Sequence, residues 1–267
     1  MKRCVGLVLA CLMVMGLLSC GAPQEKPDTS LPKLLIGSDT YPPYVYMDNN
    51  GDITGLDVEI AREALRRMGY QAQFISINWE RKKEMVNKGD IDCIWGCFSM
   101  NGREDDYQWA GPYMVSREVV AVNEHSDIQT LSDLAGRSVA VQATTKPEEL
   151  FLTRPTDDIP EVKAVFSLED RSLQYAALES GYVDAIAAHE EAIEQYMEDY
   201  NANFRFLEPP LLVSGIGVAF SNDDPRGLAD ELTKTLAEMR QDGTLLAIVS
   251  RYLPNPEKYL EVEPLER

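Results

Sequence analysis

An acid and an aromatic residue, Asp39 and Tyr41, follow a short apolar segment over residues 34–36. Pro42 and Pro43 come next, and they fix the backbone and remove two amide donors. A stiff loop at the carboxyl end of a strand is where open α/β sheets place their ligands. We therefore expect Asp39 and Tyr41 to lie on a stiff loop at the edge of the sheet where a ligand can bind.

Arg103 is a second group that can bind a charge. It follows a predicted buried strand over 91–95 and a loop rich in small residues over 96–102. A guanidinium on such a loop can bind a carboxylate through two parallel hydrogen bonds. The alternative is a surface arginine paired with Glu104 or Asp105.

Thr144 and Thr145 form a third candidate, directly after a predicted strand over 138–142. Pro147 suits the first turn of a helix, and Glu148 follows Thr145 at capping-box spacing. The free amides and the positive dipole end at such a helix start can bind a carboxylate. For Thr145 alone, plain helix capping remains the alternative.

Strands alternate with helices along the chain, which predicts an α/β fold with largely parallel sheets. The expected strands cover 34–36, 71–77, 91–95, 138–142, 164–166, 183–187 and 211–220, and residues 106–123 indicate a strand, a proline turn and a second strand. The expected helices cover 56–68, 81–86, 171–179, 190–197 and 245–252, with further helices starting near 147 and 224.

The first residues indicate export. Lys2 and Arg3 precede an apolar run over 4–18, which is too short for a normal spanning helix and fits a signal peptide over 1–19. The sequence before Cys20 resembles a lipobox, in which cleavage precedes the cysteine and its thiol receives a diacylglycerol. An ordinary signal peptide with a chance cysteine is the alternative. Residues 20–32 are polar and read as a lipid-anchored tether, so we expect an extracytoplasmic protein held at a membrane.

Composition limits the partners. Of the 267 residues, 26% are charged and 45% hydrophobic, as in globular proteins. The net charge is −19, and the acid-free signal peptide removes two positive charges, leaving about −21. This excess of acids argues against nucleic acid binding.

The cysteines and histidines indicate neither a disulfide nor a metal. In a strand, Cys93 and Cys97 would be roughly 13 Å apart, beyond the roughly 7 Å limit for a disulfide. We expect two buried free thiols. His125 and His189 have no ligand spacing to these thiols, so no metal site and no cofactor are expected.

Two segments carry a family resemblance. The first combines Asp39 and Tyr41 with Pro42-Pro43-Tyr44 and the later sequence Gly-Leu-Asp-Val-Glu-Ile over 55–60. The second is the closing pattern over 237–245 with 251–253. The chain resembles the bacterial extracellular solute-binding proteins of family 3 over residues 33–255. These are type II periplasmic binding proteins, many of them lipoproteins, that serve polar amino acid ABC transporters.

The resemblance implies two lobes, each a central, mostly parallel sheet flanked by helices. Two hinge strands would connect them, near residues 120–123 and 214–219. The first lobe would comprise 33–121 and 216–267, and the second 122–215.

The resemblance also implies roles for these residues. Arg103 would bind the α-carboxylate of an amino acid, helped by Gly96, Ser99 and the hydroxyl and amides of Thr144 and Thr145. Here the interval from Ser99 to Arg103 is shorter by one than in the family, and the glycine usual in the threonine loop is missing.

Asp39 would take the ammonium, and Tyr41 and Trp79 would form walls. A second acid usually follows the sequence Val-Asp-Ala at 183–185, but its position falls on His189, with Glu190 next. Either His189 or Glu190 binds the ligand in place of that acid, or the ligand is not an ordinary α-amino acid. A structural role is a further alternative for His189.

The expected function is that of a monomeric receptor which closes around a small amino-acid-like solute and delivers it to an ABC transporter permease. An alternative is a secreted enzyme similar to cyclohexadienyl dehydratase, with Glu190 or His189 as general acid. A further alternative is a sensor or partner-binding module on the same fold.

Overall fold

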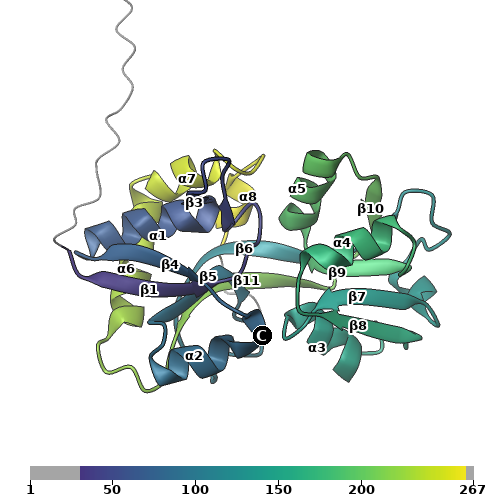
Figure 1. The fold of residues 1–267 in the computed structure, drawn as a ribbon, viewed down its shortest axis with the longest axis horizontal. Coiled ribbons are helices and arrows are strands. Elements are labelled where there is room, and N and C mark those ends of the chain that lie inside the picture. Colours follow the sequence, from purple (N-terminus) through teal and green to yellow (C-terminus); the bar gives the residue numbers. More distant parts are fainter. Residues whose placement is uncertain (1–30, 263–267) are drawn as a thin grey trace, which may run out of the picture.

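The computed structural model describes residues 31–262. The predicted signal peptide, Cys20 and nearly all of the tether lie outside the described residues. Two lobes lie side by side, joined by two long strands, β6 (Gln108–Asn123) and β11 (Leu212–Phe220) (Figure 1). No helix in the described range is both long and apolar enough to span a bilayer.

The first lobe is built on β1 (Lys33–Ser38), which pairs in parallel with β4 (Gln71–Ser76) and β5 (Cys93–Ser99). Strand β11 then adds to β5 in antiparallel orientation. Helices cover both faces of this sheet. They are α1 (Leu56–Arg67), α2 (Lys82–Lys88), α6 (Leu228–Gln241), α7 (Thr244–Val249) and α8 (Glu257–Leu260), with a 3₁₀ turn over Trp79–Arg81 and a hairpin of β2 (Tyr46–Met47) and β3 (Ile53–Thr54).

The second lobe repeats this plan. Strand β7 (Ser138–Gln142) pairs in parallel with β8 (Ala164–Leu168) and β9 (Ala185–His189). The remaining elements are α3 (Lys146–Thr153), α4 (Ser172–Glu179), α5 (Glu190–Tyr200), β10 (Phe204–Phe206) and a 3₁₀ turn over Leu131–Leu134. The two lobes have separate hydrophobic cores on the faces of their sheets. The predicted α/β fold is confirmed.

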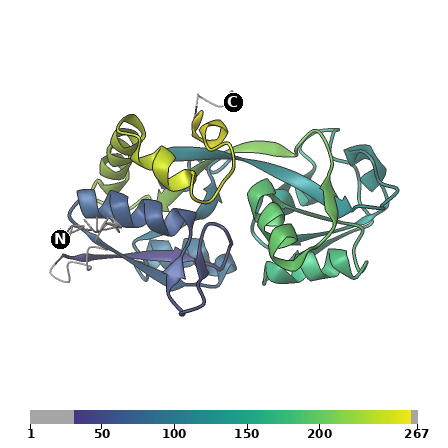
Figure 2. The same ribbon diagram turned by 90° about the horizontal axis from the view of Figure 1, so that it is seen from above.

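Strand β6 passes from one lobe to the other (Figure 2). It pairs with β11 from Gln108 to Glu118 and with β9 from Glu118 to Val122, so the strand order runs β4-β1-β5-β11-β6-β9-β7-β8. The change of partner lies at Glu118, just before the predicted crossing at 120–123; the lobe boundaries themselves stay a prediction.

The predicted proline turn inside residues 106–123 was wrong. Strand β6 continues through Pro112 with a bulge, because the four steps from Ala110 to Met114 face only two steps of β11, from Val218 to Ile216. Gly111 supplies the needed backbone freedom with a φ of 106°. The helix expected from residue 224 begins at Leu228, after a left-handed Gly227.

A buried acid holds the last part of β5. Asp57, on the first turn of α1, accepts hydrogen bonds from the Cys97 N–H at 2.7 Å and from the Tyr113 hydroxyl at 2.8 Å. Cys97 has a positive φ of 49°, a strained conformation that the bond to Asp57 supports. Burial raises the pKa of Asp57 to about 7. Cys93 and Cys97 are both buried and free, as predicted.

Replacing Asp57 tests this support. We expect Asp57→Ala to lower the free energy of unfolding by about 2–4 kcal/mol, because two buried hydrogen bonds are lost. Asp57→Asn keeps an acceptor and cannot ionise. The native pKa of about 7 lies above the ordinary 3.8, so the unfolded chain loses this proton at a lower pH than the native protein does. The free energy of unfolding of the wild type therefore falls as the pH rises through this interval.

The asparagine variant should therefore gain stability relative to the wild type between pH 4 and pH 7, as measured by urea unfolding. Glu191, whose pKa burial also raises to about 7, is present in both proteins. If the difference in the free energy of unfolding between the wild type and Asp57→Asn did not change with pH, the raised pKa of Asp57 would be contradicted.

Candidate ligand-binding site

A pocket lies between the lobes, near the point where β6 crosses. Six of the predicted site residues line it: Trp79, Ser99, Arg103, Thr144, Thr145 and His189. Two others, Asp39 and Tyr41, line an adjoining pocket that shares Trp79 with the first. Gly96 and Glu190 line neither.

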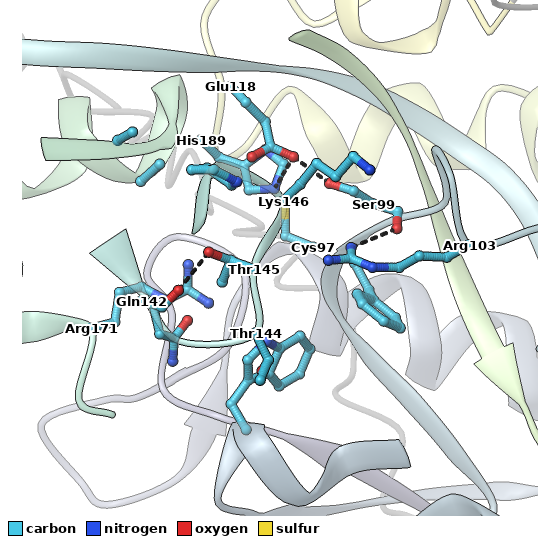
Figure 3. Close-up of a pocket in the computed structure, with 15 residues that line it drawn as sticks. Cys97, Ser99, Arg103, Glu118, Gln142, Thr144, Thr145, Lys146, Arg171 and His189 are labelled. Carbon is cyan, nitrogen blue, oxygen red and sulfur yellow. Dashed lines mark hydrogen bonds and ion pairs between the residues drawn. The ribbon is translucent and has the colours of Figure 1, made fainter. Parts of the chain in front are cut away.

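Arg103 projects into the first pocket (Figure 3). Its Nη1 donates to the Ser99 carbonyl at 3.2 Å, and the guanidinium lies over the Phe98 ring, 5.2 Å from its centroid. The Arg103 carbonyl accepts a hydrogen bond from Trp109 at 2.9 Å, which fixes the loop. The bond to Ser99 uses one of the five N–H groups of the guanidinium, so the group can still bind a carboxylate through two hydrogen bonds.

The threonine loop faces Arg103 from the second lobe. Thr144 adopts a left-handed conformation with a φ of 58°, although it is not glycine. Its N–H donates to Glu148 at 2.6 Å, and the Thr145 hydroxyl donates to the Gln142 carbonyl at 2.6 Å. The predicted capping box of Thr145 with Glu148 is therefore wrong, because Glu148 binds the preceding amide. The N–H groups of Thr145 and Lys146, at the start of α3, have no intrahelical acceptor.

Sequence reasoning missed Glu118. This carboxylate lies on β6 directly opposite His189 in the strand register, and its side chain is 1% exposed. Its Oε1 accepts hydrogen bonds from Ser99 at 2.6 Å and Ser214 at 3.0 Å, and the His189 Nε2 is 3.8 Å away. Its Oε2 is buried without a hydrogen-bond partner. The pocket therefore contains a carboxylate oxygen available to a cation.

The signal for Glu118 is present in the strand pattern. Residues two apart share a face, and Glu118 shares its face with the buried Val120 and Val122. An acid in phase with buried apolar residues indicates a buried charge, which needs a partner.

His189 lies beside this acid, and its pKa is lowered. Its Nδ1 is 2.8 Å from the Ser116 hydroxyl, and burial lowers its pKa more than the nearby Glu118 raises it. The prediction that Glu190 replaces the usual acid does not fit the structure. Glu190 begins α5 and its carboxylate pairs with Arg117 at 2.9 Å, away from both pockets.

Direct polar contacts join the lobes around the pocket. The Lys82 ammonium donates to the Thr144 hydroxyl at 2.7 Å and to its carbonyl at 3.2 Å. Burial, and then the charge of Arg103, lower the pKa of Lys82 to about 7. Asn78 donates to Glu169 at 2.6 Å. These contacts correspond to a closed arrangement of the lobes.

Asp39 and Tyr41 contact another residue that sequence reasoning missed, Arg171. Asp39 Oδ2 accepts from Gln142 at 2.7 Å and lies 3.4 Å from the Arg171 guanidinium. The same guanidinium lies 3.3 Å from the centroid of the Tyr41 ring. Trp79 is buried with its edge against Phe98, at a centroid distance of 5.4 Å. Asp39 and Tyr41 therefore have partners within the protein, although Asp39 Oδ1 is buried without a hydrogen-bond partner.

The comparisons decide the family. Residues 34–255 match the family of bacterial extracellular solute-binding proteins, family 3. The chain belongs to this family. It is similar to the L-cystine-binding protein TcyA of Bacillus subtilis (strain 168), with 24% identity over 94% of this chain and 97% of the relative. It is also similar to the L-cystine-binding protein TcyJ of Escherichia coli (strain K12), with 26% identity over 82% of each chain.

Among solved structures, Tv2483 bound to L-arginine has a TM-score of 0.76 at 27% identity, covering 83% of this chain and 90% of that one. The expected family and its type II periplasmic binding fold are confirmed.

Within residues 31–262, no group of three or more His, Cys, Asp or Glu residues is placed to hold a metal ion.

Gly96 lines neither pocket, so its ligand role stays a prediction, and its surroundings indicate a packing role. A Cβ at this position would lie 2.3 Å from the Ser38 hydroxyl, so Gly96 allows β1 and β5 to approach closely. We expect Gly96→Ala to lower the free energy of unfolding by about 1–3 kcal/mol, measured by urea denaturation.

Ser38→Ala in the same chain should restore most of this loss, because the next atom, the Ser38 Cβ, would be 3.5 Å away. If Gly96→Ala left stability unchanged but abolished ligand binding, the ligand role would be correct instead.

Proposed function

We propose that this protein binds one small amino acid between its lobes and delivers it to the permease of an ABC importer. The observation that carries the proposal is the unpartnered Oε2 of Glu118 in the same pocket as the Arg103 guanidinium. A zwitterion has the two charges that these groups complement.

Each end of the ligand has defined partners in this proposal. The α-carboxylate binds to Arg103 and to the N–H groups of Thr145 and Lys146 at the start of α3, where the helix dipole favours an anion. The α-ammonium binds to Glu118. Trp79 and Phe98 form the apolar wall. Glu118 thus takes over the role of the acid that His189 cannot fill.

The arrangement couples binding to closure. Arg103 belongs to the loop after β5, whereas Thr145 and Lys146 belong to the start of α3 in the other lobe. A ligand that contacts both makes all its bonds in the closed state and shifts the population towards it. The permease would recognise that state. Family membership and the amino-acid-binding relatives support this role.

The enzyme alternative needs a general acid in the pocket. Glu190 is paired with Arg117 outside it, and the lowered pKa of His189 makes this histidine a poor proton donor near neutral pH. The relatives named above carry the names of binding proteins. These observations favour a receptor over an enzyme.

Calorimetry across the twenty amino acids tests the binding role. We expect at least one ligand with micromolar or tighter affinity. Arg103→Ala should weaken it by about 100-fold, or about 2.8 kcal/mol, because a charged, bidentate contact is lost. Glu118→Gln should weaken it by at least about tenfold, because the ammonium loses its counter-charge.

Arg117→Ala is the matched control. Arg117 pairs with Glu190 and Glu208 and does not line the pocket, so its loss should leave affinity nearly unchanged. A complete screen without a binder would count against the receptor role, and equal affinities of the wild type and Glu118→Gln would remove Glu118 from the site.

We also propose that Cys20 carries the lipid anchor. Cells that produce the full chain and are fed tritiated palmitate should label the wild type and a Cys93→Ser control. Cys20→Ser should take up no label. An unlabelled wild-type protein would rule out the anchor.

A further inference from the structure

Arg171 occupies a position that resembles that of a bound ligand. It precedes α4, is 7% exposed and lines both pockets between the lobes. Its guanidinium lies face-on to the Tyr41 ring, 3.3 Å from the centroid, and its Nη2 is 3.4 Å from Asp39 Oδ2. These contacts join residues from opposite lobes.

An acid beside an aromatic face is a binding site for a cation. Asp39 and Tyr41 form such a pair at the carboxyl end of β1, the end where this fold places its ligand. In this chain the pair is filled from inside the protein, because Arg171 supplies both the planar cation and the ion pair. The surroundings keep Arg171 charged: burial alone would lower its pKa, but Tyr41 and Asp39 raise it.

The filled site changes which side chains the pocket can accept. Arg171 and Arg103 both line the first pocket, and the Lys146 ammonium, bonded to Glu149 at 2.6 Å, lines it as well. A cationic side chain that enters beside Arg171 would meet a like charge in a buried setting. It would find Asp39 Oδ2 bonded to Gln142 and paired with Arg171, with only Oδ1 lacking a hydrogen-bond partner, and the Tyr41 face covered by the guanidinium.

We propose that Arg171 determines specificity: it occupies the place of a cationic ligand side chain and so excludes basic amino acids from the site. The exclusion of basic ligands rests on the proposed amino-acid-binding function. The presence of a cation site between Asp39 and Tyr41 does not.

The cation site can be tested without any amino acid. Arg171→Ala removes the internal cation and leaves its place open. Millimolar methylguanidinium chloride should then raise the melting temperature of Arg171→Ala by several degrees above an equal concentration of sodium chloride. The wild type and the double variant Asp39→Asn/Arg171→Ala should show no such rise. Equal behaviour of all three proteins would overturn the proposal.

Specificity is tested by calorimetry with L-arginine and L-lysine. The wild type should show no detectable binding of either, whereas Arg171→Ala should bind at least one with an affinity at least tenfold above the weakest that the measurement detects. Arg171→Lys keeps the charge and should continue to exclude both. If Arg171→Ala does not fold, Arg171→Gln replaces it in both experiments.

The two experiments separate the two proposals. If methylguanidinium stabilises Arg171→Ala but the wild type binds no amino acid, the receptor role fails while the internal cation site stands. If the wild type binds neutral amino acids and binds L-arginine equally well, the receptor role stands and the exclusion by Arg171 is overturned.

Discussion

The site depends on one buried carboxylate at the point where a strand leaves one lobe and enters the other. A buried charge is costly unless it is paired and hydrogen-bonded. For Glu118 the pairing is half complete: Ser99 and Ser214 hold Oε1, while Oε2 has no hydrogen-bond partner. A ligand ammonium would complete it. Because Glu118 pairs with both β11 and β9 in register, its place is fixed relative to both lobes.

Closure adds the rest of the site. The first lobe supplies Arg103 and the second supplies the amides at the start of α3, so neither lobe alone makes all the contacts proposed for the carboxylate. Lys82 bridges to Thr144 in the closed arrangement, and Asp39 bridges to Gln142. These direct contacts stabilise the closed state even without a ligand. A ligand therefore shifts the population from open to closed by less than it would without them. Arg171 belongs to the same set of contacts, since it links α4 to Asp39 and Tyr41.

Local patterns were enough to predict much of this molecule. The helix expected over 56–68 is α1, and the polar loops that follow β5 and β7 bring Arg103 and Thr145 into one pocket. Both loops are defined by neighbouring residues, so the sequence contains the relevant information at short range. The two free cysteines were predictable for the same reason.

The remaining features depend on long-range register. Glu118 lies beside His189 only because β6 and β9 pair in one particular register, and Arg171 meets Asp39 across 132 residues of sequence. No local pattern specifies either contact. Glu190 was wrong as the replacement acid because the start of α5 directs it to Arg117 rather than to the pocket. The packing role of Gly96 between β1 and β5 could not be predicted, because it requires knowledge of the neighbouring strand.

A crystal structure of the protein with its tightest-binding amino acid is the most direct test. The ligand ammonium should lie about 3 Å from Glu118 Oε2, with the carboxylate bound bidentately by Arg103. An ammonium bound to Asp39 in place of Arg171, with Glu118 making no contact to the ligand, would contradict the account.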